Sequence, residues 1–250
     1  MTLLAPPRSI ERTCYLVGAV LIVSGLLHLL MFGIDPRPWE GPLSWRKPVT
    51  FGVSFGLTLV SITWIASYLR LRHSTRRWLL GLFAADCVLE VGGITLQAWR
   101  HVPSHFNTTT TTNSVVAFSL AAGGALLIIT LGTLALTALR GRIRGPGSMR
   151  LALRAGFALL LAGLGSGVAM IVRGTTLGRS GDLTAAYSDG GYLKLFHAVT
   201  LHAVLVLALL AWYLNRTHSD DHRNTMIVAA AAAAYTLVAA GTLLVSLIER

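Results

Sequence analysis

The chain has 250 residues, of which 54% are hydrophobic and only 12% are charged. Charged residues make up roughly a quarter of an average soluble domain. A water-soluble fold is therefore excluded, because its surface would carry too little charge. With a mean hydropathy of +0.64, the composition indicates a protein that crosses the membrane several times.

The net charge of +11 does not indicate a nucleic-acid partner, because the basic residues lie in short loops between apolar spans. In that position they orient a membrane protein. Both cysteines, Cys14 and Cys87, fall inside apolar spans, which argues against a disulfide or a redox pair. The first apolar segment lacks a cleavage site followed by a soluble domain, so we expect it to be a retained helix.

Seven apolar stretches are long enough to cross about 30 Å of hydrocarbon as helices. The alternating segments typical of a β-barrel are absent. We therefore predict an all-α fold, a single seven-helix transmembrane domain over residues 1–250, in contact with the lipid of a bacterial inner membrane. The spans are expected near residues 14–34, 48–69, 78–99, 114–139, 151–172, 192–214 and 226–248.

Lysine and arginine are unequally divided between the two sides of this bundle, thirteen against eight. Cytoplasmic loops are enriched in these residues. The amino terminus is therefore predicted to be cytoplasmic and the carboxyl terminus to lie outside. Within the bundle, Gly163 and Gly167 form a GxxxG pattern and residues 229–234 are all alanine, which is typical of close helix packing.

One polar stripe follows the third span. At 100° per residue, Asp86, Glu90, Gly93, Gln97 and Arg100 fall within a sector of about 80°. Ionisable groups inside a membrane are expensive and mark functional sites by default. We expect this stripe to face the interior of the bundle, either as a functional site or as a structural hydrogen-bond network.

Three histidines lie in the predicted outer half of the membrane. His28 in the first span and His197 in the sixth lie at about the same depth, and His202 lies nearer the level of Glu90. His197 and His202 differ in direction by about 140° on a helix, so they cannot chelate one ion as an i, i+4 pair would.

Basic residues also gather at the predicted outer ends of the helices. Snorkelling side chains and an aromatic belt explain such residues one by one, yet this side should be poor in cations. The excess favours an anionic partner. The rim comprises Trp45, Arg46, Lys47, Arg100, His101, His105, Arg173 and Lys194.

Three stretches together resemble an uncharacterised family of bacterial seven-helix integral membrane proteins. They read GPLSWRKPVTFG at residues 41–52, ITLQAWRHVPSHFN at 94–107 and LFHAVTLHAV at 195–204. The likeness covers most of residues 25–215. It implies the seven-helix architecture and supplies no mechanism.

A more distant likeness is to the ceramidase and progestin-receptor-like membrane hydrolases, which combine a Ser-x-x-x-His, an acid and a two-histidine helix around zinc. Ser24 and His28 have that spacing, and Asp86 would be the acid. His197 and His202 are one residue further apart than in that pattern. The Ser-x-x-x-His pair and the two-histidine pair also occur on different helices, counted along the chain, from those of that family.

The favoured hypothesis is a metal-dependent membrane enzyme with an outward-facing site. His28, His197, His202 and Glu90 would hold a divalent metal, zinc above all, which uses three protein ligands and a water in catalytic sites. The metal would turn that water into a nucleophile, with Asp86 or Glu90 as the general base. An anionic, lipid-like or hydrophobic substrate would be held by Lys47, Gln97, Arg100, His105, Arg173 and Lys194.

Other classes stay open. His28 and His197 could be the two axial ligands of a b-type haem in an oxidoreductase, since they lie at matching depth on different helices. A proton-coupled transporter or a metal-free proton-transfer enzyme would use Glu90 as the proton carrier. A structural or accessory subunit is the least specific alternative.

Overall fold

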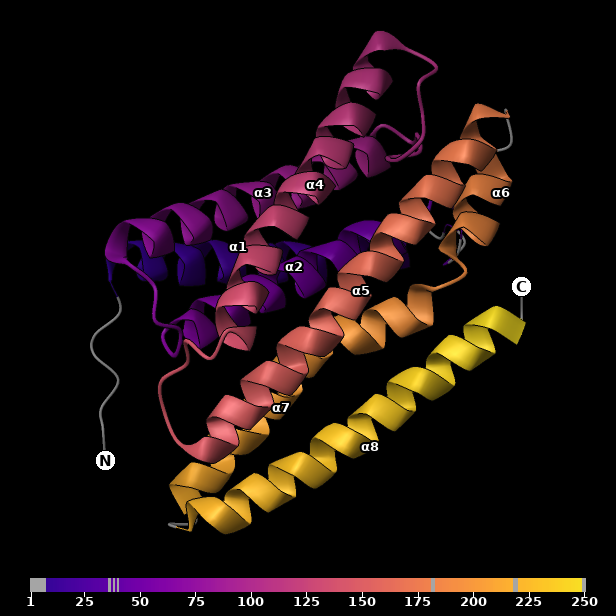
Figure 1. Cartoon of the computed structure of the whole chain (residues 1–250). Coiled ribbons are helices and arrows are strands. Elements are labelled where there is room, and N and C mark those ends of the chain that lie inside the picture. The colour runs from indigo at the N-terminus through magenta and orange to yellow at the C-terminus, as the bar shows by residue number, and fades with distance from the viewer. Residues whose placement is uncertain are drawn as a thin grey trace. The chain divides into compact units, whose positions relative to one another are not determined.

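A computed structural model describes residues 8–35, 37, 39, 41–180, 183–217 and 220–248. These residues form helices and short connections (Figure 1). The helices are α1 (Ser9–Ile34), α2 (Arg46–Ala66), α3 (His73–Trp99), α4 (Thr111–Leu139), α5 (Gly147–Arg179), α6 (Leu183–Ser188), η1 (Asp189–Gly191), α7 (Lys194–Thr217) and α8 (Asp221–Ile248).

Seven of the described helices, α1 to α5 with α7 and α8, are long and apolar enough to cross a membrane. The predicted all-α fold with seven spans is confirmed. A helix pairs its backbone N–H and C=O groups internally, and this is required in hydrocarbon, which offers no hydrogen-bond partners. The largest difference between a predicted and an observed helix end is in α5, which was expected to end at residue 172 but continues to Arg179. Arg173 therefore lies inside a helix that was expected to end there.

Large apolar side chains cover the outside of these helices. Leu30 is 65% exposed, Phe118 68% and Leu237 73%. Exposure of such a side chain to water costs free energy, whereas contact with equally apolar lipid tails does not. The exposed apolar surface and the seven apolar helices together identify a multi-pass membrane protein in contact with a bilayer.

The chain divides into two compact units. The first comprises residues 1–67 and 71–130, and the second comprises residues 68–70 and 131–250. Helix α4 contributes to both. The prediction of one domain over the whole chain stays a prediction, and the two units are described separately below.

In the first unit, α1 and α2 approach through glycines. A Cβ atom on Gly25 would lie 2.9 Å from the carbonyl oxygen of Val49, and one on Gly56 would lie 2.5 Å from that of Gly18. Only a residue without a Cβ permits such contact between two backbones. This close approach of α1 and α2 was not predicted from the sequence.

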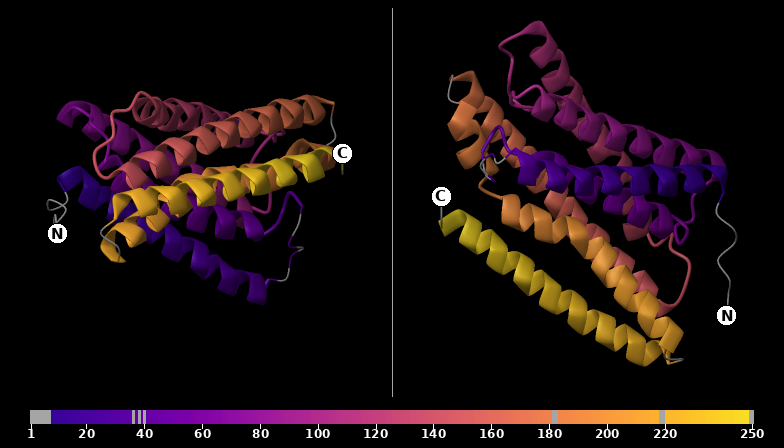
Figure 2. Two further views of the ribbon diagram at one scale, coloured as in Figure 1. Left: turned by 60° about the horizontal axis from the view of Figure 1, so that its bottom comes forward. Right: turned by 180° about the vertical axis from the view of Figure 1, so that it is seen from behind.

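In the second unit, α5 and α7 also pack closely, and the right view of Figure 2 shows α7 and α8 as antiparallel neighbours joined at one end. A Cβ atom on Gly163 would lie 2.7 Å from Oγ1 of Thr200, and one on Gly167 would lie 3.0 Å from Cε1 of His197. The close helix contact predicted for Gly163 and Gly167 is therefore confirmed, with α7 as the partner.

A carboxylate from α8 caps the beginning of α5. The backbone N–H groups of Gly147 and Ser148 donate to the two oxygens of Asp221 at 2.8 and 3.1 Å. The Ser148 hydroxyl donates to the same carboxylate at 2.9 Å. The first N–H groups of a helix have no partner within the helix and attract negative charge, so Asp221 joins α8 to α5.

Candidate functional site

The polar stripe on α3 is buried and faces α4. Asp86, Glu90 and Gln97 are exposed by 1%, 5% and 0%, as an inward-facing stripe requires. A Cβ atom on Gly93, in the middle of the stripe, would lie 2.9 Å from the Leu120 side chain of α4. Arg100, at the end of the stripe, is exposed.

The two carboxyl groups of this stripe converge on Gly123 of α4. Oε1 of Glu90 and Oδ1 of Asp86 lie 2.7 and 2.8 Å from the position that a Cβ atom on Gly123 would take. The two oxygens are therefore at most about 5.5 Å apart, the sum of those distances. Glycine at position 123 leaves the space that the carboxyl groups occupy.

No ion pair within the described residues includes Asp86 or Glu90. Both oxygens of Asp86 are buried and form no hydrogen bond with any described residue. Among the described residues, the ion pairs join Arg37 to Asp35 and Arg76 to Glu11. Neither lysine nor arginine occurs in residues 48–66 of α2, in residues 111–139 of α4 or in residues 13–34 of α1.

Beyond the carboxyl pair, the stripe ends in a hydrogen-bonded group between α3 and α4. Nη1 of Arg100 donates to Oε1 of Gln97 at 2.6 Å and to Oδ1 of Asn113 at 2.9 Å. Nε2 of Gln97 donates to the same Asn113 oxygen at 3.2 Å. The guanidinium of Arg100 therefore donates to two neutral amide groups. Asn113 was not among the predicted site residues, because an asparagine at a helix start reads as a capping residue.

His28 lies in an aromatic cluster and both of its ring nitrogens are occupied. The Trp99 indole N–H donates to Nε2 of His28 at 3.1 Å. An indole N–H can only donate, so the ring proton is on Nδ1, which donates to the carbonyl oxygen of Ser24 at 2.7 Å. The Trp45 ring lies 5.2 Å from that of Trp99, between centroids.

An ion pair in the loop after α1 contacts this aromatic cluster. Arg37 donates to Oδ2 of Asp35 at 2.6 Å, and its guanidinium carbon lies 4.1 Å from the centroid of the Trp45 ring. Hydrogen bonds from Arg37, and from the Trp45 indole at 3.1 Å, hold the pKa of Asp35 below its ordinary value. Asp35 was not among the predicted site residues.

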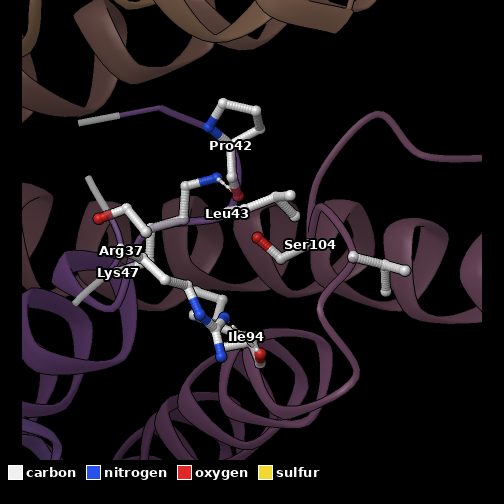
Figure 3. A pocket seen from close by; sticks show the side chains of 9 residues that line it. Arg37, Pro42, Leu43, Lys47, Ile94 and Ser104 are labelled. Atoms are coloured by element: carbon white, nitrogen blue, oxygen red, sulfur yellow. Dashed lines mark hydrogen bonds between the residues drawn. The ribbon is translucent and has the colours of Figure 1, made fainter. Parts of the chain in front are cut away.

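Two of the resembling stretches, residues 41–52 and 94–107, meet at this end of the first unit. Between them is a cavity of about 10 Å³, room for about one water molecule (Figure 3). Lys47 donates to the carbonyl oxygen of Pro42 at 3.0 Å beside it. The cavity is lined by Arg37, Pro42, Leu43, Ser44, Lys47, Ile94, Ala98, Val102 and Ser104.

His105 belongs to the same region and is neutral near pH 7. Its Nδ1 lies 2.9 Å from the Ser104 hydroxyl, and its ring lies 6.1 Å from that of Phe51. Burial of the imidazole, with a further contribution from the positive charge of Lys47, lowers the pKa of His105 to about 4. His105 therefore adds a neutral imidazole, and not a positive charge, to the predicted rim.

The other predicted site residues belong to the second unit. His197 places Nδ1 at 2.8 Å from the carbonyl oxygen of Gly163, and His202 places Nδ1 at 2.6 Å from that of Ala198. Lys194 donates to the carbonyl oxygen of Tyr187 at 3.0 Å. The Arg173 guanidinium carbon lies 5.3 Å from the centroid of the Tyr192 ring.

The predicted metal site is not found in the described part of the chain. No group of three or more His, Cys, Asp or Glu side chains is close enough there to hold one ion. His28 and Glu90 lie in the first unit, whereas His197 and His202 lie in the second. Oε1 of Glu90 lies beside Gly123 of α4, and His28 accepts a hydrogen bond from Trp99. In the hydrolase-like set of Ser24, His28 and Asp86, the Ser24 atom that contacts His28 is the backbone carbonyl oxygen.

The chain was compared with protein-family models, with curated proteins and with solved structures, and none of them matches.

Proposed function

We propose that the protein is a proton-coupled membrane transporter whose proton-binding group is the pair Asp86 and Glu90. The observation that carries this proposal is that two buried carboxyl groups converge on Gly123, and that no ion pair within the described residues includes either of them. Ionisable groups inside membrane proteins commonly form proton relays and coupling sites.

Ionisation of both buried carboxyl groups at once costs free energy. Each ionised carboxylate that leaves water loses several kcal/mol of hydration free energy. Two such charges held at most about 5.5 Å apart also repel one another. One shared proton removes this repulsion. The protonated carboxyl group can then donate its O–H to the other carboxylate, as in known pairs of carboxyl groups that hold one proton between them. The pair is therefore suited to take up and release a proton.

The other interpretations receive less support from the contacts. A zinc-dependent hydrolase needs three protein ligands around the metal, and the described residues hold no such group. A haem ligand needs a free imidazole nitrogen, yet the Trp99 indole donates to Nε2 of His28. A metal-free proton-transfer enzyme would use the same two carboxyl groups and is the second candidate.

Infrared spectroscopy of the purified protein in lipid nanodiscs tests the proton-binding pair. Protonated Asp86 and Glu90 should give a carboxylic C=O band that titrates with pH and is lost in the double variant Asp86→Asn, Glu90→Gln. Cys87→Ala is the matched control, because Cys87 is buried on the same helix and has no carboxyl group. A titrating band that survives in the double variant would exclude this pair as the proton-binding group.

Proton-driven transport is tested in proteoliposomes that contain a pH-sensitive dye. An imposed pH gradient should drive proton flux in the native protein and in Cys87→Ala, but not in Glu90→Gln. Equal flux in Glu90→Gln and in the native protein would contradict the proposal. Substrate turnover without net proton flux would favour the enzyme.

A further inference from the structure

The geometry of Arg100 points to the second substrate: we propose that its guanidinium binds a small carboxylate anion that is transported together with the proton. This inference rests on the proposed function, because the proton is the one bound by Asp86 and Glu90. It names the class of the co-substrate.

The first observation is that several N–H donors of Arg100 are not used in hydrogen bonds with described residues. Of its three guanidinium nitrogens, only Nη1 takes part in hydrogen bonds within the described residues, to Gln97 and to Asn113. The side chain is exposed. The edge formed by Nη2 and Nε therefore keeps parallel N–H groups, and this fork matches the two oxygens of a carboxylate.

The second observation is that the charge of Arg100 is not neutralised by protein. Both acceptors of its hydrogen bonds are neutral amides, and neither of the ion pairs in the described chain includes it. The amides fix the guanidinium in place, with Gln97 fully buried and Asn113 exposed by only 3%. A positive charge held rigidly and without a counter-ion is a preformed receptor for an anion.

The third observation is the distance to the proton-binding pair along one helix. Arg100 follows Glu90 by ten residues, which is about 15 Å at 1.5 Å per residue. The stretch between them is lined by Gly93 and Gln97 and covered by α4. Charges at this separation with an effective dielectric constant near 20 change each other's binding by about sixfold.

Charge balance explains why the two sites would work together. An anion alone is costly to carry through hydrocarbon. One carboxylate and one proton carry no net charge between them, so the loaded protein has the same net charge as the empty one. By linkage, the proton must raise the affinity for the anion by the same factor as the anion raises that for the proton.

The test is to repeat the infrared titration of the carboxyl band in potassium acetate and in potassium chloride at equal ionic strength. Acetate should increase the proton affinity of the pair by about sixfold. The increase should vanish in Arg100→Gln and be reduced in Arg100→Lys, which keeps the charge but loses the fork. Arg179→Gln, another exposed arginine at the same predicted side of the membrane, should behave like the native protein.

Equal titrations in acetate and chloride, or an acetate effect that persists in Arg100→Gln, would overturn the assignment of Arg100. If a titrating band is present in those cases, the proton-binding pair still stands. If no titrating band is found in either salt, the proposed function itself fails, and the co-substrate proposal fails with it.

Discussion

Nη1 of Arg76 on α3 lies 3.1 Å from Oε1 of Glu11 on α1, and the two side chains are only 6% and 11% exposed. The second oxygen of Glu11 accepts a hydrogen bond from the backbone N–H of Arg8 at 2.9 Å. This buried ion pair joins two helices of the first unit at the end that the arginine distribution predicts to be cytoplasmic. By contrast, Asp86 and Glu90 are buried carboxyl groups that no ion pair within the described residues includes.

Removal of one partner of this ion pair should destabilise the protein strongly. Arg76→Met leaves the Glu11 carboxylate buried and uncompensated, which typically costs about 3–5 kcal/mol. The double variant Glu11→Gln, Arg76→Met leaves no buried charge and should recover much of the loss. Thermal unfolding in detergent measures both, with the exposed neighbour Arg77→Met as the control. Additive losses in the double variant would show that the two side chains are not coupled.

The glycine contact between α1 and α2 should not tolerate a methyl group. In Gly56→Ala the new Cβ would lie 2.5 Å from the carbonyl oxygen of Gly18, a backbone atom that cannot rotate away. Overpacking of this kind costs about 1–3 kcal/mol. Gly92→Ala on α3 is the control, because nothing lies within 4 Å of its added Cβ. Equal thermal stability of the two variants would contradict the close approach.

His105 should make stability depend on pH. Its pKa is lowered to about 4 in the folded protein, whereas the ordinary value is 6.5. Between these values the unfolded chain binds a proton that the folded protein does not, so the free energy of unfolding decreases as pH falls from 6.5 towards 4. His105→Gln removes the titrating group and should flatten the dependence. The midpoint of chemical unfolding, measured over this range, checks it, and an unchanged pH slope in the variant would exclude His105 as the cause.

The cap that α8 places on α5 should contribute measurably to the second unit. Asp221→Ala removes the acceptor of the Gly147 and Ser148 N–H groups, and loss of such a cap typically costs about 1 kcal/mol. Hydrogen exchange should accelerate at the first turn of α5 more than at its centre. Asp189→Ala, at an exposed carboxylate outside this contact, should leave the exchange of α5 unchanged. Uniform acceleration along α5 would point to global destabilisation and not to a cap.

Several features of the protein follow from the sequence alone. Seven spans could be recognised because a helix must present about twenty apolar residues to cross hydrocarbon, whatever its neighbours are. The stripe on α3 could also be predicted, since the helical period places Asp86, Glu90 and Gln97 on one face and the cost of exposing them to lipid turns that face inward. The small residues at 163 and 167 marked a helix contact, though not its partner.

The tertiary structure alone decided which groups meet. His28 is bonded to Trp99, which follows it by 71 residues, and no periodic pattern relates two separate helices. The proposed metal set joined residues that matched in depth, but depth says nothing about rotation around the bundle or about which unit a helix belongs to. Gly123 shows the same limit, because a glycine in an apolar helix has no side chain to indicate that two carboxyl groups fill its place. Local periodicity sets the direction of each side chain, whereas its partner is set by how the helices pack.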